Sequence, residues 1–405
     1  MKSFNTIIHP ADQSGCAFYR MKSPAWSAQT LRKDISIVDS PKMIPMPEFY
    51  KDIRHVKLQR QVSHGQRDFL MKFLKPLSDN LGFWLSYDID DVIGPDDIPM
   101  YNAARGAFQA PGLADNIKEM INAVDFLTVP TEEMAKYYNI KFGQPFEKIQ
   151  VIPNYLPRWW IGAAYDAYRI EQKYDANKKK PRLGFICSST HFDMKNQNNG
   201  VDDFTHINSF IRKTVDKYQW VFVGGIPQQL KDLVQTKKIE LHAGVDLLNY
   251  PRALMEKNID CIVAPLADNI FNRCKSNIKL LEGWALGIPV ITQDLEPYRP
   301  YTDMLFNDEN ELQDRLDYVL KDKKRYMKMV KENRKIVDYG NPQAPNGWWL
   351  EKNMGTHFGL FMIPQKTMTV DISNPKISEE INNKTIAAEL ERQSGGVKPL
   401  SFDRS

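Results

Sequence analysis

Short runs rich in β-branched and aromatic residues alternate with longer stretches of helical periodicity up to about residue 335. In the first part of the chain, the expected strands are Asn5–Ile8, His55–Gln59, Phe83–Tyr87, Phe126–Val129 and Ile149–Ile152. The helices expected between them are Pro24–Arg32, Gln66–Pro76, Ala114–Ala123 and Glu132–Tyr138. Strands that alternate with helices in this way are typical of parallel α/β sheets.

A second series of the same kind follows a turn-rich break at 153–157. Its expected strands are Arg182–Cys187, Trp220–Val223, Ile239–Leu241, Asp260–Ala264 and Pro289–Thr292. Its expected helices are Asp203–Lys217, Gln229–Gln235, Tyr250–Lys257, Ile278–Ala285 and Glu309–Lys321. A chain of 405 residues exceeds what one hydrophobic core usually serves. The pattern therefore predicts two Rossmann-like α/β domains, 1–170 and 171–335, facing a central cleft, where such folds bind nucleotides. We expect the remaining extension, 336–405, to pack back on the first domain and to end in a flexible tail.

Composition narrows the classes of function only slightly. The 54 basic and 50 acidic residues give a net charge of +4, which permits a polyanionic partner without requiring one. No apolar run is long enough to span a bilayer, so we expect no integral membrane association, and the first residues do not resemble a signal peptide. The four cysteines are scattered, which is typical of reduced thiols in a cytoplasmic protein.

The clearest chemical signal lies at 258–291, which the pattern predicts to be strand, loop, helix, tight turn and strand. Ser276 or Asn277 is a suitable N-cap, so the segment around Lys275 presents free backbone N–H groups and a cation at a helix start. That arrangement favours a diphosphate. Glu282 follows within two turns, where its carboxylate can accept hydrogen bonds from ribose hydroxyls.

This segment reads P-L-A-D-N-I-F-N-R-C-K-S-N-I-K-L-L-E-G-W-A-L-G-I-P-V over 265–290. It resembles the donor-site signature of GT-B glycosyltransferases of the family 4 type. G-C-A-F-Y-R at 15–20, Y-D-I-D-D at 87–91, V-P-T-E at 129–132 and V-I-P-N at 151–154 are similar to further elements of that family. The resemblance covers roughly residues 5–335. It implies a UDP-sugar donor, retention at the anomeric carbon, and no permanently bound cofactor or required metal.

The resemblance and the expected strand ends together assign binding residues to each side of the cleft. The donor-binding candidates are Lys195, Gly224, Gly225, Gly244, Val245, Lys275, Ser276, Asn277, Lys279 and Glu282. The acceptor-binding candidates are Gly15, Tyr19, Arg20 and Arg60. For the two glycines after the Trp220–Val223 strand, a plain turn is the alternative. For Arg20 the alternative is a surface salt bridge.

The catalytic candidates are Asp88, Asp90, Asp91 and His191, all of which follow expected strands. One of the three carboxylates can orient or deprotonate the acceptor hydroxyl. Helix capping and a D-x-D metal site are the alternatives, and a two-domain fold with a helix-borne phosphate site makes a metal unnecessary. His191 lies in the loop expected to face the diphosphate, as does Lys195, whose charge would oppose that of the departing group.

One departure from the family pattern affects the donor sugar. Family 4 enzymes often carry two glutamates separated by seven residues, and Cys274 stands where the first would fall. Asp268 is a possible replacement. The sugar and the stereochemical outcome therefore stay open, as does a non-catalytic nucleotide-binding or DNA-binding protein with a degenerate fold.

The acceptor hypothesis also comes from resemblance. The chain resembles glycosyltransferases of large tailed phages, some of which attach glucose or arabinose to 5-hydroxymethylcytosine in DNA. This implies a double-stranded DNA partner in the host cytoplasm, with Arg54, Lys57, Arg60 and Arg67 following the phosphates and the target base flipped into the cleft. The alternative acceptor is a polysaccharide or a lipid-linked sugar.

Overall fold

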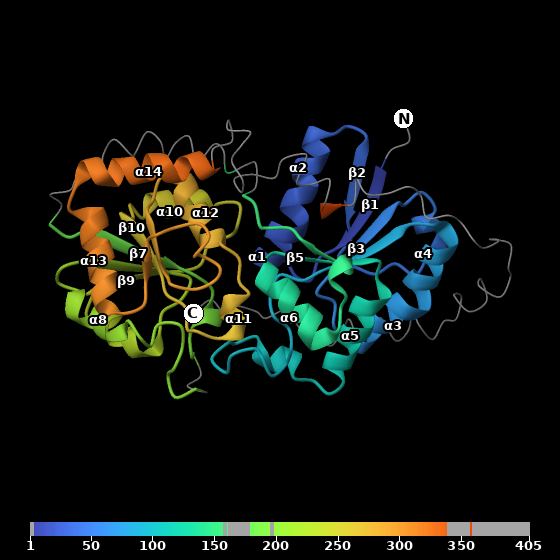
Figure 1. Cartoon of the computed structure of the whole chain (residues 1–405), viewed down its shortest axis with the longest axis horizontal. Coiled ribbons are helices and arrows are strands. Elements are labelled where there is room, and N and C mark those ends of the chain that lie inside the picture. The colour runs from blue at the N-terminus through green and yellow to red at the C-terminus, as the bar shows by residue number, and fades with distance from the viewer. Residues whose placement is uncertain (1–3, 157–159, 161–178, 195–197, 338–356, 359–405) are drawn as a thin grey trace.

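The computed structural model describes residues 4–156, 160, 179–194, 198–337 and 357–358. These form two α/β halves that lie side by side, the first in blue and cyan and the second in green to orange (Figure 1). Each half contains a six-stranded sheet, and the described pairings are parallel. Among the described residues, no helix has both the length and the apolar character needed to cross a bilayer.

The sheet of the first half has the order β2-β1-β3-β4-β5-β6. Its strands are β1 (Phe4–His9), β2 (Ile35–Asp39), β3 (His55–Gln59), β4 (Trp84–Asp88), β5 (Phe126–Val129) and β6 (Ile149–Val151). Its α-helices are α1 (Gly15–Ala17), α2 (Ser23–Leu31), α3 (His64–Phe69), α4 (Lys75–Leu81), α5 (Leu113–Ala123) and α6 (Glu132–Phe142). The π-helical turn η1 (Phe18–Lys22) joins α1 to α2, and the π-helical turn η3 (Leu70–Leu74) joins α3 to α4. The short 3-10 turns are η2 (Pro47–Tyr50), η4 (Arg105–Phe108) and η5 (Phe146–Lys148).

The sheet of the second half has the order β12-β11-β10-β7-β8-β9. Its strands are β7 (Arg182–Ile186), β8 (Gln219–Val223), β9 (Ile239–His242), β10 (Cys261–Ala264), β11 (Val290–Gln293) and β12 (Leu305–Phe306). Its helices are α8 (Asn208–Thr214), α9 (Lys231–Gln235), α10 (Tyr250–Glu256), α11 (Ile270–Arg273), α12 (Ile278–Ala285), α13 (Glu309–Leu320) and α14 (Lys323–Val337), with 3-10 turns η7 (Ser189–His191) and η8 (Gln228–Leu230).

The strand orders fix where a ligand site can form. The direction of winding reverses between β1 and β3 in the first sheet and between β7 and β10 in the second. In open α/β sheets, ligands bind outside the carboxyl ends of the strands at such a switch point. Tyr19 follows β1, Arg60 follows β3, His191 follows β7 and Lys275 follows β10. The topology therefore brings the predicted segments to the two switch points.

The expected strands are all present, with ends that differ by one or a few residues, but the expectations about elements were incomplete. The sequence did not indicate the edge strands β2 and β12 or the helices α11 and α14. The helix expected at Asp203–Lys217 begins only at Asn208, because side chains hold the preceding turn: Asp202 accepts from the amide of Phe204, and Thr205 accepts from the amide of Asp202. These local bonds compete with the first helical turn.

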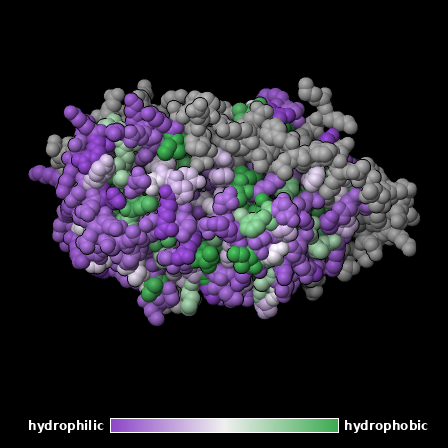
Figure 2. Space-filling model, viewed as in Figure 1, coloured by the Kyte–Doolittle hydropathy of each residue, from purple (hydrophilic) through white to green (hydrophobic). Residues whose placement is uncertain are grey.

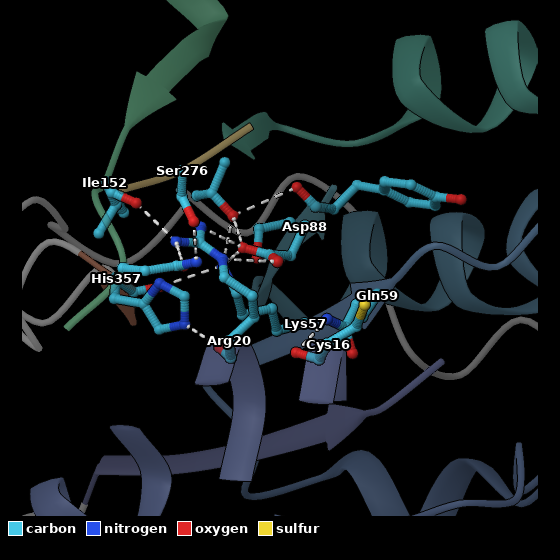
Figure 3. Close-up of polar contacts among 12 residues, drawn as sticks. Cys16, Arg20, Lys57, Gln59, Asp88, Ile152, Ser276 and His357 are labelled. Carbon is cyan, nitrogen blue, oxygen red and sulfur yellow. Dashed lines mark hydrogen bonds and ion pairs between the residues drawn. The ribbon is translucent and has the colours of Figure 1, made fainter. Parts of the chain in front are cut away.

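A buried ion cluster links the carboxyl ends of the central strands of the first half (Figure 3). Asp88 accepts from Arg20 Nε at 3.1 Å and Nη2 at 2.8 Å, and Lys57 Nζ lies 3.7 Å from the same carboxylate. All three side chains are fully buried. Burial would raise the pKa of Asp88, but Arg20 and Lys57 outweigh it and hold that pKa below its ordinary value. Burial lowers the pKa of Lys57 to about 7.

Residues 357–358 contact this cluster from the far end of the chain. His357 Nε2 lies 2.6 Å from the carbonyl oxygen of Arg20, and the carbonyl of His357 accepts from Lys57. Phe358 is fully buried and packs with Met21 and Ile152 in a core of the first half. The chain thus returns to the first half at these two residues, while the rest of the expected extension lies outside the described residues.

We expect Asp88→Asn to lower the free energy of unfolding by about 3–5 kcal/mol, because it leaves the Arg20 guanidinium buried without a counter-charge. Denaturant titration of the purified variant measures this loss. Asp232→Asn is the control, since it also removes a carboxylate that binds an arginine through both oxygens, but in an exposed pair with Arg212. Equal midpoints for the two variants would contradict the structural importance of the buried cluster.

Candidate functional site

The two halves meet through polar side chains on the loops that follow the strands. The hydrogen bonds that cross between them include Tyr19 OH to Glu282 Oε1 at 2.7 Å, Tyr101 OH to Asp203 Oδ1 at 2.6 Å, Thr131 Oγ1 to the carbonyl of Cys274 at 2.9 Å, and Asn154 Nδ2 to Ser276 Oγ at 2.8 Å. Tyr101 OH also accepts from Asn269 and Asn272. The candidate residues for donor and acceptor therefore border the same interface.

The start of α12 has the features of an anion site. Asn277 is its N-cap, makes no side-chain capping bond and is 4% exposed, and its Nδ2 has no hydrogen-bond partner among the described residues. Lys275 Nζ lies 4.8 Å from the centre of the Phe271 ring and forms no ion pair within the described part of the chain. The first amides of a helix also lack intrahelical acceptors. Unpaired donors and a free cation at a helix start together favour a phosphate group.

The helix itself is held firmly against the sheet. Leu280, Leu281 and Trp284 are buried on its inner face. A Cβ on Gly283 would lie 2.4 Å from Val290 Cγ2 and 3.1 Å from the carbonyl oxygen of Ile288, so only glycine permits this close approach of α12 to β11. The helix start is therefore a rigid part of the second half, which suits a preorganised binding site.

Glu282 lies one turn inside α12 and is 4% exposed. Its Oε1 accepts from Tyr19, and its Oε2 accepts from Tyr250 OH and from Lys279 Nζ, both at 3.1 Å. Two of these donors are hydroxyl groups, which is the chemistry that a ribose presents. Lys279, a predicted donor residue, thus holds Glu282 in the described conformation.

His191 is joined to a carboxylate that the sequence did not single out. Its Nδ1 lies 2.7 Å from Asp203 Oδ2, while Asp203 Oδ1 accepts from Tyr101, Asn272 Nδ2 and the amide of Ala267. Burial lowers the pKa of His191, and the nearby charge of Lys275 lowers it further, although Asp203 opposes both effects. His191 and the start of α12 therefore lie close together at the second switch point.

On the first half, Asp12, Cys16, Arg60, Asp90 and Asp91 form an acidic cluster. The Arg60 guanidinium lies 2.7 Å from Asp12, 3.7 Å from Asp90 and 3.6 Å from Asp91. Asp90 Oδ1 is buried and has no hydrogen-bond partner among the described residues. Burial raises the pKa of Asp90 to about 6, and the charge of Asp91 adds to this effect while Arg60 opposes it. Asp90 therefore has the properties of a proton acceptor at neutral pH.

Within the described residues, Cys16, Asp90 and Asp91 also place a thiol and two carboxylates close enough to hold a cation. The chemistry of the group does not fit a resident metal well. The Arg60 guanidinium already supplies positive charge to both carboxylates, and burial raises the pKa of the Cys16 thiol, which disfavours the thiolate that metals bind. We therefore assign no metal to this cluster.

Arg20 and Asp88 occupy positions that differ from the expected ones. Their side chains are fully buried and bind each other, so neither presents a polar atom to solvent at the cleft, and we leave both out of the proposed contacts. Arg20 acts on the site indirectly. Its Nη1 donates to Asn154 Oδ1, and Asn154 in turn binds Ser276 at the start of α12.

The loop glycines Gly224, Gly225 and Gly244 follow the carboxyl ends of β8 and β9. Gly224 has φ +94°, and a Cβ there would lie 2.1 Å from the carbonyl oxygen of Cys187, so glycine is required by the backbone itself. Gly244 approaches Gly224 closely, and Val245 is 38% exposed. Gly225 lies half-buried beside them, Gly15 faces open space after β1, and Lys195 lies outside the described residues.

The basic residues expected to follow DNA phosphates do not form a free basic track. Lys57 is fully buried, Arg67 binds Asp68 and Glu119, and Arg60 binds the acidic cluster. Arg54 precedes β3 and so lies at the end of the strand opposite to the cleft. The expectation failed because sequence shows the charge of a residue but not the partner that neutralises it.

The replacement proposed for the missing glutamate also has another partner. Asp268 binds Arg273 through both carboxylate oxygens, at 2.6 and 2.8 Å, on an exposed surface. Cys274 is fully buried and packs, with Phe271, against the core of the first half. The position of the first glutamate thus serves the contact between the halves.

Solved structures match this architecture over most of its length. The Anabaena protein Alr3699/HepE in complex with UDP and glucose has a TM-score of 0.53 at 12% identity, covering 82% of this chain and 94% of that chain. The same protein in complex with UDP-glucose has a TM-score of 0.53 at 11% identity, covering 96% and 99%. A glycosyltransferase from Rickettsia africae ESF-5 has a TM-score of 0.52 at 12% identity, covering 95% and 100%. The chain thus has the expected α/β fold of GT-B type. No protein-family model and no curated protein matches its sequence.

We expect His191 to titrate below the ordinary histidine value and to regain part of that shift in Lys275→Met, because the substitution removes the cation that opposes protonation. Imidazole proton shifts recorded by NMR across pH 4–9 measure this, with the resonance assigned by its loss in His191→Gln. Lys213→Met is the control, since Lys213 pairs with Glu309 on the surface. An unchanged pKa of His191 in Lys275→Met would show that the two residues do not share a site.

Proposed function

We propose that this chain is a glycosyltransferase, which binds a UDP-sugar against the second half and transfers the sugar to a hydroxyl group held by the first half. The observation that carries the proposal is the start of α12, where, among the described residues, Lys275 forms no ion pair and the buried Nδ2 of Asn277 has no hydrogen-bond partner, one turn from the carboxylate of Glu282. The GT-B fold adds support, because proteins with this fold were solved with UDP and with UDP-glucose.

In this proposal, the diphosphate of the donor binds at the start of α12, with Lys275 and the amides after Ser276 opposing its charge. Glu282 accepts hydrogen bonds from the ribose in place of those it accepts from Tyr19 and Tyr250. The exposed loops at Gly224, Gly225, Gly244 and Val245 lie at the ends of β8 and β9 and would border the base. Lys275 and the amides at the start of α12 stabilise the diphosphate leaving group, on which negative charge develops.

We further propose a glycan hydroxyl as the acceptor, in preference to 5-hydroxymethylcytosine in DNA. The acidic cluster of the first half carries three carboxylates, Asp12, Asp90 and Asp91, against the single cation Arg60. A polyanion would be repelled there, whereas carboxylates and arginine bind sugar hydroxyls readily. The polysaccharide or lipid-linked sugar that the sequence left as the alternative fits this charge better.

Asp90 is the residue we propose to accept the acceptor's proton. As the C1–oxygen bond to the diphosphate breaks and the acceptor oxygen bonds to C1, the hydroxyl proton passes to the carboxylate of Asp90, whose Oδ1 lies 3.7 Å from the Arg60 guanidinium. In this proposal Lys275 and the amides at the start of α12 oppose the charge of the diphosphate, and no metal is assigned to the reaction. The retention of anomeric configuration implied by the resemblance remains part of the proposal.

Lys275→Met should weaken UDP binding by about 10- to 100-fold, which corresponds to the loss of one charge-assisted hydrogen bond. Isothermal titration with UDP in EDTA measures this, and Lys213→Met should bind as the wild type does.

The acceptor is tested by incubating the protein and a panel of UDP-sugars with oligosaccharides and, separately, with hydroxymethylated duplex DNA. Mass spectrometry identifies the products, and NMR gives their anomeric configuration. UDP binding without turnover on any pair would favour a binding protein, and a mass increment on DNA alone would overturn the glycan proposal.

Turnover should rise with pH through about 6 and then level, because Asp90 acts only when it is ionised. Asp90→Asn should lower kcat by about 100-fold or more and remove this rise, while leaving the affinity for UDP unchanged. Asp97→Asn is a matched control, since Asp97 pairs with Tyr137 and Lys141 away from the cluster. A rise at pH 6 that persists in Asp90→Asn would assign the titration to another group.

A further inference from the structure

One network of side chains joins His191 to the first half. Asp203 is 1% exposed and lies between β7 and α8, while Tyr101 lies on the loop between β4 and α5. Tyr101 OH donates to Asp203 at 2.6 Å and accepts from Asn269 and Asn272, at 3.2 and 3.0 Å. A hydroxyl of the first half is thus surrounded by polar groups of the second.

The hydrogen bonds of Asp203 define the state of His191. Four donors surround the carboxylate. Burial would raise the pKa of Asp203, but His191, the charge of Lys275 and the Tyr101 hydroxyl outweigh it and hold that pKa below its ordinary value. An ionised carboxylate can only accept, so the proton of the neutral imidazole lies on Nδ1. Nothing among the described residues bonds to Nε2, which is therefore the free position of the ring.

We propose that Asp203 is a positioning residue that holds His191 with Nε2 available to the donor diphosphate, and that Tyr101 completes this arrangement only when the two halves are closed. This inference rests on the proposed function. It adds that closure of the cleft controls the orientation of the His191 ring, through a tyrosine that contacts neither substrate in this proposal.

The chemistry assigned to His191 concerns the leaving group. When the bond between C1 and the diphosphate oxygen breaks, the electron pair stays on that oxygen, and a protonated Nε2 donates a hydrogen bond to it. The proton of the acceptor hydroxyl still passes to Asp90, so His191 need not gain or lose a proton during the transfer itself. Such a donor acts most strongly where charge develops.

Charged groups around His191 explain why it becomes a donor only with substrate present. Asp203 raises the pKa of His191, while Lys275 and Lys279 lower it together with burial. A bound diphosphate would neutralise the two lysines and add negative charge, which favours the imidazolium. The ring of Phe185 packs edge-on against the imidazole and carries no charge. The histidine thus gains its proton as the donor binds.

Three variants test the proposal in a double-mutant cycle. Tyr101→Phe removes only the hydroxyl and should lower kcat about 3- to 10-fold. Asp203→Asn should lower kcat about 100-fold and shift the His191 titration to lower pH. In a His191→Gln background, Tyr101→Phe should have no further effect, because the tyrosine acts through the histidine. Tyr137→Phe is the control, since it loses a similar bond to Asp97 within the first half.

Two readouts separate this proposal from a purely structural role and from failure of the proposed function. The ¹⁵N shifts of His191 report the proton on Nδ1 in the wild type and a shifted equilibrium in Asp203→Asn. UDP affinity reports the donor site independently of turnover. If the wild type neither binds UDP nor turns over, the proposed function fails. If it does both, but Tyr101→Phe lowers kcat equally with and without His191, or leaves kcat unchanged, the link through His191 is overturned. If Asp203→Asn does not fold, the double-mutant cycle of Tyr101→Phe and His191→Gln still tests the link.

Discussion

The site depends on the polar contact between the halves, which consists mainly of hydrogen bonds between loops. Such bonds exchange for bonds to water at a small net cost, so they can open to admit a ligand and form again around it. The apolar contact is concentrated at α11, where Phe271 and Cys274 pack against the first half. The face seen in Figure 2 is largely hydrophilic, with hydrophobic residues in separate patches. An interface of this kind suits a cleft that closes over a substrate, because closure gains bonds without burying a large apolar surface.

Charge is distributed unequally across that interface. The second half places Lys275 beside the positive end of α12, where Lys279 is paired with Glu282, and the first half places the carboxylates of Asp12, Asp90 and Asp91 around Arg60. A molecule with an anionic part and a neutral, hydroxyl-bearing part would bind in one orientation only. The asymmetry is what the proposed transfer requires, with an anionic donor on one side and an uncharged acceptor on the other.

Hydrophobic periodicity was sufficient to predict the inner strands of both sheets, because buried parallel strands are continuous apolar runs that the sequence displays directly, but it missed the edge strands β2 and β12. The start of α12 was predictable for a related reason: capping residues, cation and carboxylate lie within eight positions of one another. The partners of charged residues were not predictable. Arg20 and Asp88 are 68 positions apart, and Asp203 and Tyr101 are separated by 102. Nothing local distinguishes a buried Lys57 from an exposed lysine on a strand, since only the fold supplies Asp88 and Thr128 as its neighbours.

The same packing explains why a cysteine, and not the glutamate that the resemblance predicts, suits position 274. Cys274 is fully buried, its carbonyl accepts from Thr131, and its side chain packs in the core of the first half. A carboxylate there would lose its hydration without gaining a described cation, at a cost of several kcal/mol. A small apolar side chain therefore stabilises the contact that keeps α11 against the first half. Asp203, Asn272 and His191 are polar and are joined to the first half through Tyr101, so the packing at Cys274 and the network at Asp203 together make the arrangement of these polar groups depend on how the halves meet.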